Sequence, residues 1–352
     1  MTAEQPGVRA AAVSDWLARR LPDAAPPFAF ARLPGGNSNL TYRAEDRAGR
    51  AVVLRRGPVG RTLPTAHDML REARVLTALR GGGLPVPAVY AVCDDPEVTG
   101  APFFVMEYVD GIVCAGRRQA ADLTGAQRTR AGESLAETLG ALHRLDPDRV
   151  GLGDLGRRSG YVERQLARWH AQWTAGRLRV LPAIDAAHAL LAARVPAQRA
   201  TGVVHGDFRL DNCVLAPDGA VRAVLDWEIC ALGDPLADLG VLLAYWAEPG
   251  DRVSALQDPP TLAGGFPGRD RMLAAYLAAT GAPSGEHGAI RASVPYYIAF
   301  AWWKLACIVE GVYTRTAQGA APAAGRDEAG YARQAQRLAD HALKLAAALP
   351  GG

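Results

Sequence analysis

Short runs of alternating apolar and polar residues fill the first third of the chain, a pattern typical of half-buried β-strands. These runs predict strands over 28–33, 40–43, 51–56, 89–93 and 103–108. Two other segments, 9–21 and 66–80, have apolar residues at helical spacing and predict helices. Glycine and proline gather at 34–39 and 57–65, which predicts a turn and a loop. The first third therefore predicts a small sheet accompanied by two helices.

The spacing of apolar residues becomes helical after Gly111 and stays so almost to the end. The predicted helices are 124–144, 160–176, 184–194, 236–247, 269–279, 289–316 and 328–348. The main exception is 203–227, which predicts a strand, a loop and a second strand. A change from strands to helices along one chain indicates an α+β protein with two unlike lobes. We expect a small antiparallel N-terminal lobe over 1–107 and a larger, mainly helical lobe over 108–352.

Composition and charge narrow the functional classes. The 352 residues are 49% hydrophobic and 21% charged, with a net charge of +3, and the basic residues are scattered, so we expect no nucleic-acid partner. Five cysteines without a C-x-x-C pair suggest neither a disulfide framework nor a zinc knuckle, which fits a reducing compartment. The N-terminus lacks the apolar segment of a signal peptide. We therefore expect a cytoplasmic protein.

One apolar stretch, 294–312, is long enough to raise the question of a membrane span. It contains Lys304 and Glu310, and charged residues are costly in the hydrocarbon core of a bilayer. The stretch predicts a buried amphipathic helix, and we expect no membrane association.

The segment 203–215, VVHGDFRLDNCVL, carries the sharpest chemical signal. Asp207 is followed five residues later by Asn212, the spacing of the catalytic loop in protein kinases, and nineteen residues later by Asp226 at the end of an apolar run. Phosphoryl transfer needs a base for the attacking hydroxyl and oxygen ligands for the metal ions that neutralise the phosphates. A single Asp in a turn is more often a cap, but the ordered combination favours this chemistry. Arg209 occupies the place where many kinases carry a loop lysine near the γ-phosphate.

Two earlier segments have the order expected of phosphate-binding elements. The turn between the first two predicted strands contains Gly35, Gly36, Ser38 and Asn39, and its glycines allow backbone N–H groups to approach phosphate oxygens. A plain hairpin turn has a similar composition. The third predicted strand ends at 55–56 in two arginines, where kinases carry a lysine for the α- and β-phosphates.

Arg55 and Arg56 are both candidates for this cation, since the register of the strand is open. Arg55 lies on the same face as Val53 if the strand alternates regularly. Arginine can neutralise phosphate, but its planar guanidinium is not equivalent to an ammonium. Glu72, in the next predicted helix, is the candidate ion-pair partner. The alternative places Glu72 on a solvated helix face.

The predicted strand 103–108 runs into Asp110 and Gly111, where a hinge that binds adenine would lie. Adenine needs backbone donors and acceptors beside an apolar slot. Met106 would border the slot, and the backbones of Glu107 and Val109 would bind the base. An edge strand followed by a turn is the alternative.

At this point the order of motifs resembles the aminoglycoside phosphotransferase and choline kinase superfamily, which has a protein-kinase-like fold. A closer resemblance is to the phosphotransferases related to the N-terminal kinase domain of certain acyl-CoA dehydrogenase fusion proteins. It covers about 28–316 and is carried by GGNSNLTY at 35–42, 67–72, GLGDLG at 151–156, 161–169, 205–240 with HGDFRLDN and GDPLADLG, and 297–315.

The resemblance implies Asp207 as the base, Asn212 and Asp226 as ligands of Mg²⁺, and an ATP cleft between the lobes. It also implies a small-molecule hydroxyl as the phosphoryl acceptor. This sequence contains no dehydrogenase domain, so a stand-alone kinase is expected. The resemblance implies neither an oligomeric state nor a preference for ATP over GTP.

Three further residues have mainly structural interpretations. Asp234 followed by Pro235 predicts a helix start, with Asp as the N-cap. Asp238 in that helix is expected to brace the catalytic loop. His143 is expected to be a buried, hydrogen-bonding histidine rather than a catalytic one.

The acceptor is the least determined feature of the sequence. Arg164 and Arg168 lie one helical turn apart beside Tyr161 and Trp169, and a later helix adds the aromatic cluster 296–303 and Lys304. That mixture suits an anionic or partly apolar acceptor, such as a hydroxyacyl compound. The alternative, which we rank first, makes these residues core aromatics and solvated arginines.

Three functional classes remain open. The first is a small-molecule kinase, with an aminoglycoside kinase as one variant. The second is a nucleotide-binding pseudokinase, which the arginine on the third strand favours and the intact Asp207, Asn212 and Asp226 oppose. The third is a protein kinase, which lacks support because no Ala-Pro-Glu segment is present and the interval between Asp226 and Asp234 is too short for a peptide-docking platform.

Overall fold

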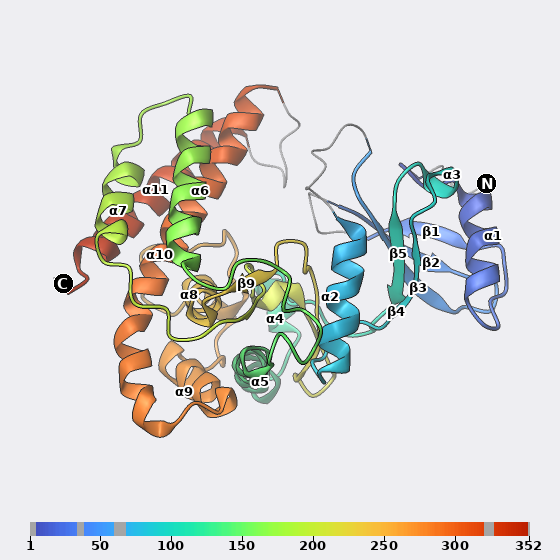
Figure 1. The fold of residues 1–352 in the computed structure, drawn as a ribbon, viewed down its shortest axis with the longest axis horizontal. Helices are drawn as coiled ribbons and strands as arrows, with labels where there is room; N and C mark the ends of the chain where they lie inside the picture. The colour runs from blue at the N-terminus through green and yellow to red at the C-terminus, as the bar shows by residue number, and fades with distance from the viewer. Residues whose placement is uncertain (1–4, 34–38, 60–67, 320–326, 351–352) are drawn as a thin grey trace. The chain divides into compact units, whose positions relative to one another are not determined.

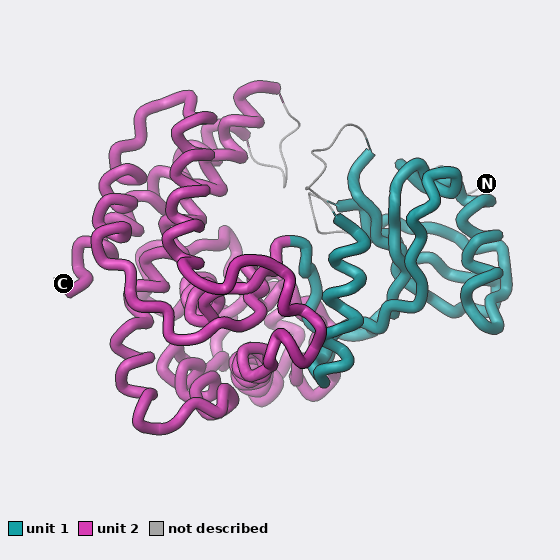
Figure 2. The backbone as a smooth tube through the Cα atoms, viewed as in Figure 1, with its two compact units in different colours: residues 1–111, 222–228 teal, residues 112–221, 229–352 magenta. Residues whose placement is uncertain are grey.

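The computed structural model describes residues 5–33, 39–59, 68–319 and 327–350. The chain divides into two units, coloured in Figure 2. Unit 1 contains 1–111 together with 222–228, and unit 2 contains 112–221 and 229–352. The short return of 222–228 to unit 1 is supported by the N–H of Val224, which donates to the carbonyl of Pro85 at 2.8 Å.

Unit 1 is built on a five-stranded antiparallel sheet with the strand order β1-β2-β3-β5-β4 (Figure 1). The strands are β1 (Ala29–Arg32), β2 (Leu40–Glu45), β3 (Ala51–Arg56), β4 (Val89–Cys93) and β5 (Phe103–Glu107). Central strand β3 pairs with β2 through Thr41↔Arg55 and with β5 through Arg55↔Phe104. Strand β3 is hydrogen-bonded to a neighbouring strand on each side, so its backbone is held in place. The backbone of Arg55 is therefore held in place as well.

In the described part of unit 1, the sheet is accompanied by the helices α1 (Ala10–Arg20), α2 (Met69–Gly81) and α3 (Pro96–Thr99). Helix α2 begins after Asp68, whose carboxylate accepts the N–H of Arg71 at 3.0 Å as an N-cap. Its buried face includes Val75, Leu76 and Leu79 and packs against β4 and β5. On the same helix, Glu72 is also buried, which requires a charged partner inside the unit.

Unit 2 is mainly helical. Its α-helices are α4 (Arg117–Ala121), α5 (Gly125–Arg144), α6 (Tyr161–Gly176), α7 (Pro182–Ala192), α8 (Pro235–Tyr245), α9 (Arg269–Thr280), α10 (Ser284–Ala317) and α11 (Glu328–Ala347). Helix α10 is the central one and packs against α6, α7, α8 and α11. Gly240 of α8 lies so close to α10 that an added Cβ would sit 2.4 Å from the carbonyl oxygen of Tyr297. Glycine therefore allows α8 and α10 to pack at this distance.

Helix α10 is long and apolar enough to cross a membrane by length and composition. Within the structure, however, 72% of its most apolar window is buried against other helices, as in the core helix of a globular unit. The stretch 294–312 thus forms the buried helix that the sequence predicts.

In unit 2, short strands flank the loop 205–212, which contains Asp207 and Asn212. Strand β6 (Gly202–Val204) pairs antiparallel with β9 (Ala231–Gly233), and a 3-10 turn over Leu210–Asn212 leads into β7 (Cys213–Leu215). Strand β8 (Val221–Val224) follows. Helix α8 starts directly after β9, where Asp234 caps it by accepting the N–H of Leu236 at 3.0 Å. The predicted N-cap and the Pro235 start are therefore confirmed.

The strands and long helices predicted from the sequence are all present, with ends shifted by a few residues. The sequence did not predict α3, α4, β7 or β9, which span only three to five residues. Elements this short contain too few apolar positions to establish a periodicity, and their neighbours in the fold decide them.

Candidate active site

The loop 205–212 is held by a carboxylate from the interior of unit 2. Asp238 is fully buried in α8, and its two oxygens accept the N–H groups of His205 at 2.6 Å and Gly206 at 2.8 Å. Gly206 has φ +89°, a left-handed conformation that favours glycine. The expectation that Asp238 braces this loop is confirmed.

His143 makes a further contact with Asp238. His143 is buried, with Nε2 3.5 Å from Oδ2 of Asp238 and Nδ1 2.9 Å from the hydroxyl of Tyr276. Burial raises the pKa of Asp238, but its hydrogen bonds and the charges of His143 and His205 outweigh that effect, so its pKa lies below the ordinary value. His143 is therefore a structural histidine, as the sequence predicts.

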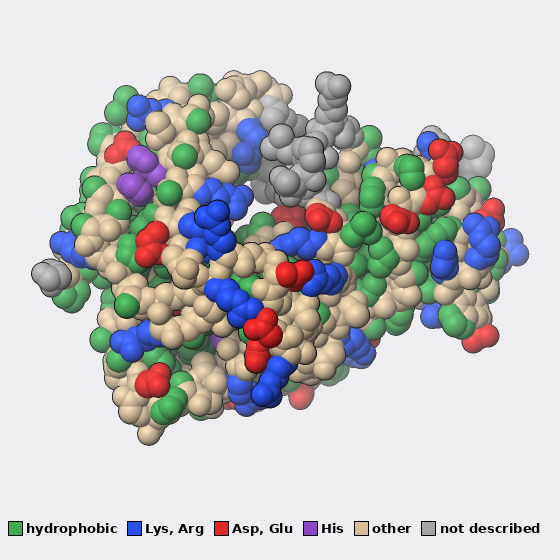
Figure 3. Space-filling view, in the orientation of Figure 1, with side chains coloured by type: hydrophobic (Ala, Val, Ile, Leu, Met, Phe, Trp, Pro, Cys, Tyr) green, Lys and Arg blue, Asp and Glu red, His purple; other side chains and the backbone are tan. Residues whose placement is uncertain are grey.

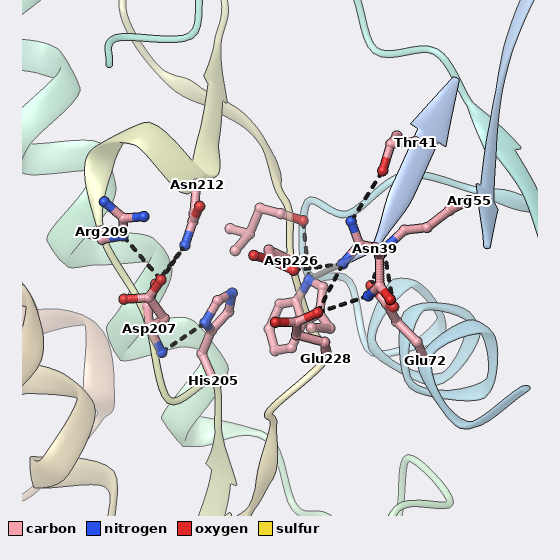
Figure 4. A network of polar contacts seen from close by, with 12 residues as sticks. Asn39, Thr41, Arg55, Glu72, His205, Asp207, Arg209, Asn212, Asp226 and Glu228 are labelled. Atoms are coloured by element: carbon pink, nitrogen blue, oxygen red, sulfur yellow. Dashed lines mark hydrogen bonds and ion pairs between the residues drawn. The ribbon is translucent and has the colours of Figure 1, made fainter. Parts of the chain in front are cut away.

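The carboxylate of Asp207 is oriented by two neighbouring side chains (Figure 4). Nδ2 of Asn212 donates to Oδ2 of Asp207 at 3.0 Å and to its backbone carbonyl at 2.9 Å. Nε of Arg209 donates to the same Oδ2 at 3.0 Å. Asp207 still exposes 28% of its side chain, so a partly accessible carboxylate is held in one orientation.

Arg209 is itself held in place. Its Nη1 donates to Asp211 at 2.5 Å, and its guanidinium lies 5.1 Å from the centre of the Tyr245 ring. Burial disfavours the charged guanidinium, but the carboxylates of Asp207 and Asp211 outweigh it and raise the pKa of Arg209. The sequence places Arg209 near the γ-phosphate, whereas the observed contacts are to these two carboxylates.

Asn212 has the chemistry of a ligand for a hard cation. Its amide nitrogen is committed to Asp207, and its Oδ1 makes no hydrogen bond to the described part of the chain. Mg²⁺ prefers oxygen ligands and typically takes only one or two from protein, with phosphates and water completing its shell. Among the described residues, no group of three or more His, Cys, Asp or Glu could hold a metal ion.

In unit 1, Arg55 is the centre of a second polar network (Figure 4). Its Nε lies 2.9 Å from Oε1 and 3.0 Å from Oε2 of Glu72. Its Nη2 donates to Oδ1 of Asp226 at 2.6 Å and lies 3.8 Å from Glu228. The expected ion pair with Glu72 is present. Burial disfavours the charge of Arg55, but these three carboxylates outweigh it and raise its pKa.

Arg56 points to the other side of the sheet. Its guanidinium donates to the carbonyls of Gly57, Gly7 and Thr99. Successive residues of a strand alternate between faces, so only one of the two arginines can reach Glu72. Of the two candidates that the sequence left open, Arg55 is the one beside Glu72.

Asp226 has φ +66°, and the only other described non-glycine residue with positive φ is Asp23. Such a conformation costs on the order of 1–3 kcal/mol and concentrates at functional sites. With this backbone conformation, the carboxylate of Asp226 accepts Nη2 of Arg55. The strain is therefore consistent with a functional Asp226.

Glu228 is a member of this network that the sequence did not single out. Its Oε2 accepts Nδ2 of Asn39 at 2.7 Å. It lies two residues after Asp226, and this closeness in the sequence was the available signal. Asn39 thus uses its side chain within unit 1. The other predicted phosphate-loop residues, Gly35, Gly36 and Ser38, lie outside the described residues.

The predicted hinge follows β5. Met106 is buried. The N–H of Glu107 donates to the carbonyl of Ala88, just before β4, at 2.8 Å, and its carboxylate accepts the Ala88 N–H at 3.1 Å. Among the described residues, the N–H of Val109 donates to no protein group.

A cavity of about 380 Å³ lies between α6 and α10 in unit 2. Its walls are mostly apolar or aromatic, and its lining includes Trp169, Trp173, Cys307, Ile308, Gly311 and Thr314. Glu310 also lines it, but Arg179 binds both of its oxygens, at 2.9 and 2.6 Å. The cavity volume is within the range of small-molecule sites.

The tyrosines and tryptophans over 296–303 and Tyr161 are buried core residues. Tyr297 donates its hydroxyl to Asp234 at 2.6 Å, and Trp303 donates Nε1 to the carbonyl of Ile184 at 3.0 Å. Arg168 is exposed, and Figure 3 shows Lys and Arg side chains gathered over α6. The alternative ranked first describes the aromatic residues over 296–303 and the exposed Arg168. Arg164, by contrast, is half-buried and donates to the carbonyls of Ser159 and Arg157, and Trp169 lines the cavity.

Comparison with known proteins identifies relatives that match most of this chain. The phosphotransferase enzyme family is matched over residues 29–290. Mouse acyl-CoA dehydrogenase family member 10 is 33% identical over 307 residues, which cover 86% of this chain but only 28% of that protein. The chain thus spans less than a third of that relative.

Solved structures show the same fold. A Ralstonia eutropha protein with a provisional assignment as an aminoglycoside phosphotransferase has a TM-score of 0.78 at 28% identity, covering 97% of this chain and 99% of that one. A mutant of aminoglycoside phosphotransferase APH(4)-Ia, solved with ADP and hygromycin B, has a TM-score of 0.62 at 16% identity, covering 95% and 98%. The fold is the α+β, protein-kinase-like fold that the sequence predicts.

Proposed function

This chain belongs to the phosphotransferase enzyme family, and on that premise we propose that it is a kinase that moves the γ-phosphoryl group of ATP to a hydroxyl of a small molecule. The observation that carries the proposal is the orientation of Asp207 by Asn212 and Arg209 on a loop held by Asp238. A carboxylate that is partly exposed and fixed in direction can accept the proton of an attacking hydroxyl.

Each remaining residue has a defined part in this proposal. Asn212 and Asp226 would hold Mg²⁺, which supplies charge neutralisation at the phosphates. Arg55, aimed by Glu72, would bind the α- and β-phosphates. Arg209 would act mainly by orienting Asp207, since both of its described ion pairs are with carboxylates of the loop.

The experiment that tests the function is a screen for acceptor-dependent formation of ADP from ATP and Mg²⁺, with mass spectrometry of the products. Hydroxyacyl thioesters, free hydroxy acids and aminoglycosides form the acceptor panel. We expect turnover with at least one hydroxylated acceptor. Nucleotide binding without turnover on any acceptor would favour the pseudokinase, which the arginine of β3 also favours.

The cavity between α6 and α10 supports an acceptor with an apolar part, such as a hydroxyacyl compound. Its one acidic wall residue, Glu310, is already neutralised by Arg179, and Arg315 also lines the cavity. A polycationic aminoglycoside would therefore meet no unpaired carboxylate there. The acyl-CoA dehydrogenase relatives are compatible with this class.

Replacement of Asp226 by alanine should weaken binding of the magnesium–nucleotide complex by tenfold or more, about 1.4 kcal/mol. The change removes one of two proposed metal ligands and one of the carboxylates around Arg55. Calorimetric titration of ATP with and without Mg²⁺ measures it, with the exposed Asp94→Ala in the same unit as control. Wild-type affinity and wild-type magnesium dependence in the Asp226 variant would contradict the metal role.

Filling the cavity with Gly311→Leu should raise the KM for the acceptor about tenfold or more, since lost or added methylenes in an apolar pocket change binding by ~1–3 kcal/mol. The KM for ATP should not change. Gly288→Leu is the matched control, because Gly288 lies on the same helix and an added Cβ there meets nothing within 4 Å. Equal acceptor KM values in the two variants would place the acceptor elsewhere.

A further inference from the structure

Lysine is almost absent from this chain. Of its 39 lysines and arginines, only Lys304 and Lys344 are lysines. Lys344 is exposed on α11, whereas Lys304 is buried in α10, with 7% of the residue exposed. A sequence that uses arginine for 37 of its 39 basic residues (39 minus the two lysines) has one of its lysines at a position where a charge is expensive to bury. Such a position calls for a specific role for the ammonium group.

The contact of Lys304 is with the loop that carries Asp207. Its Nζ donates to the carbonyl oxygen of Gly206 at 3.0 Å. That carbonyl belongs to the peptide bond between Gly206 and Asp207. The N–H of the same peptide donates to Nδ1 of His205 at 3.2 Å. The peptide directly before Asp207 is thus hydrogen-bonded at both ends.

Lys304 also adds to the hydrogen bonds by which Asp238 holds the loop. Asp238 accepts the two preceding N–H groups, those of His205 and Gly206, but it cannot bind a carbonyl. Only a donor can fix the Gly206 carbonyl, and Lys304 supplies one. An acceptor from α8 and a donor from α10 therefore hold successive peptides of one loop.

The surroundings of Lys304 leave its pKa below the ordinary value, although two nearby carboxylates support the charge. Burial lowers the pKa of Lys304 and Arg168 lowers it further, while the carboxylates of Asp207 and Asp238 act in the opposite direction. The ring centre of Trp169 lies 5.9 Å from Nζ. An ammonium on a long stem can reach a single carbonyl, whereas a planar guanidinium presents several donors that would need partners.

We propose that Lys304 is a positioning residue of the proposed phosphotransferase, which fixes the Gly206 carbonyl and thereby the direction of the Asp207 carboxylate. The proposal rests on the proposed function, because it assigns Asp207 as the base. Lys304 acts through the loop and not on the acceptor. A buried methionine of similar length could fill the same space at lower electrostatic cost, so packing alone does not account for the lysine.

Amide hydrogen exchange tests the positioning without any acceptor. Lys304→Met should accelerate exchange in peptides covering 203–212 by about tenfold, the change that loss of a hydrogen bond worth ~1.4 kcal/mol produces. Lys344→Met, at the exposed lysine, should leave exchange unchanged. Exchange over 203–212 that is the same in both variants, at equal melting temperature, would overturn the proposal.

Steady-state kinetics separates positioning from acceptor binding. With an acceptor from the screen, Lys304→Met should lower kcat about 10²-fold with little change in either KM, because a displacement of about 1 Å costs that much. Lys304→Arg keeps a charged donor and should recover part of kcat. This recovery would show that the loss of kcat in Lys304→Met comes from the missing donor and not from misfolding. A raised acceptor KM at unchanged kcat would overturn positioning in favour of direct acceptor binding. If wild type turns over no acceptor, the proposed function fails, while the exchange result still decides the role of Lys304.

Discussion

Replacement of Asp207 by asparagine should lower phosphoryl transfer by about 10²–10⁴-fold, the usual contribution of a general base. Asparagine keeps the size of the side chain, and its amide oxygen can still accept from Asn212 and Arg209, which now bind Oδ2 at 3.0 Å. What it loses is the capacity to take a proton. We expect ATP affinity to change little, so the effect should appear in kcat.

The measurement is acceptor-dependent ADP formation combined with calorimetric ATP binding. Asp207→Ala should be at least as inactive, since it also leaves Asn212 and Arg209 without their shared acceptor. Asp218→Asn, at an exposed turn of the same unit, makes the same chemical change and should retain wild-type rates. Wild-type turnover in Asp207→Asn would refute the assignment of the base.

The largest effect on folding should follow the removal of Asp238. In Asp238→Ala two buried N–H groups, of His205 and Gly206, lose their acceptor, and His143 loses a charged neighbour. Unsatisfied buried donors cost ~1–3 kcal/mol each, so we expect a loss of roughly 3–5 kcal/mol in the free energy of unfolding. The proposed transfer reaction should slow as well, because the loop before Asp207 is no longer held.

Denaturant unfolding followed by far-ultraviolet circular dichroism measures this loss. The control is Asp327→Ala at the exposed N-cap of α11, which removes one hydrogen bond, to the N–H of Gly330, and should cost only about 1 kcal/mol. A change in Asp238→Ala no larger than in this control would contradict the buried-brace account.

The pH of the measurement matters for Asp238. Because the folded-state pKa of Asp238 lies below its ordinary value of 3.8, its contribution to stability is complete above that value and is lost as the pH falls through the folded pKa. The comparison between Asp238→Ala and wild type should therefore be largest at neutral pH and shrink only in strong acid.

Much of the site was encoded locally and could be predicted from the sequence. The separation of Asp207 and Asn212 by five residues spans one turn, so their hydrogen bonds follow from a short stretch of chain. Strand alternation restricted the cation of β3 to one of two neighbouring arginines. Asp234 followed by Pro235 determined where α8 begins, and through that start the position of Asp238 one turn later.

Other parts of the site depend on contacts between residues far apart in the chain. Glu228 meets Asn39 across 189 positions, and Lys304 meets Gly206 across 98. Such pairs leave no periodic pattern in the local sequence. They form only once α10 has packed in unit 2 and residues 222–228 have joined unit 1. The tertiary structure also decided which of Arg55 and Arg56 pairs with Glu72, because the pairing depends on which face of the sheet α2 covers with Glu72.

The sequence by itself determined the order of the strands and helices, the family resemblance and the spacing of Asp207, Asn212 and Asp226, because each of these is written in neighbouring residues. Only the tertiary structure decided what holds those residues in place. A buried carboxylate from α8 and a buried ammonium from α10 bind the same loop. Their hydrogen bonds to the loop are strong because both groups are shielded from water. Packing creates that burial, and the local sequence does not determine it.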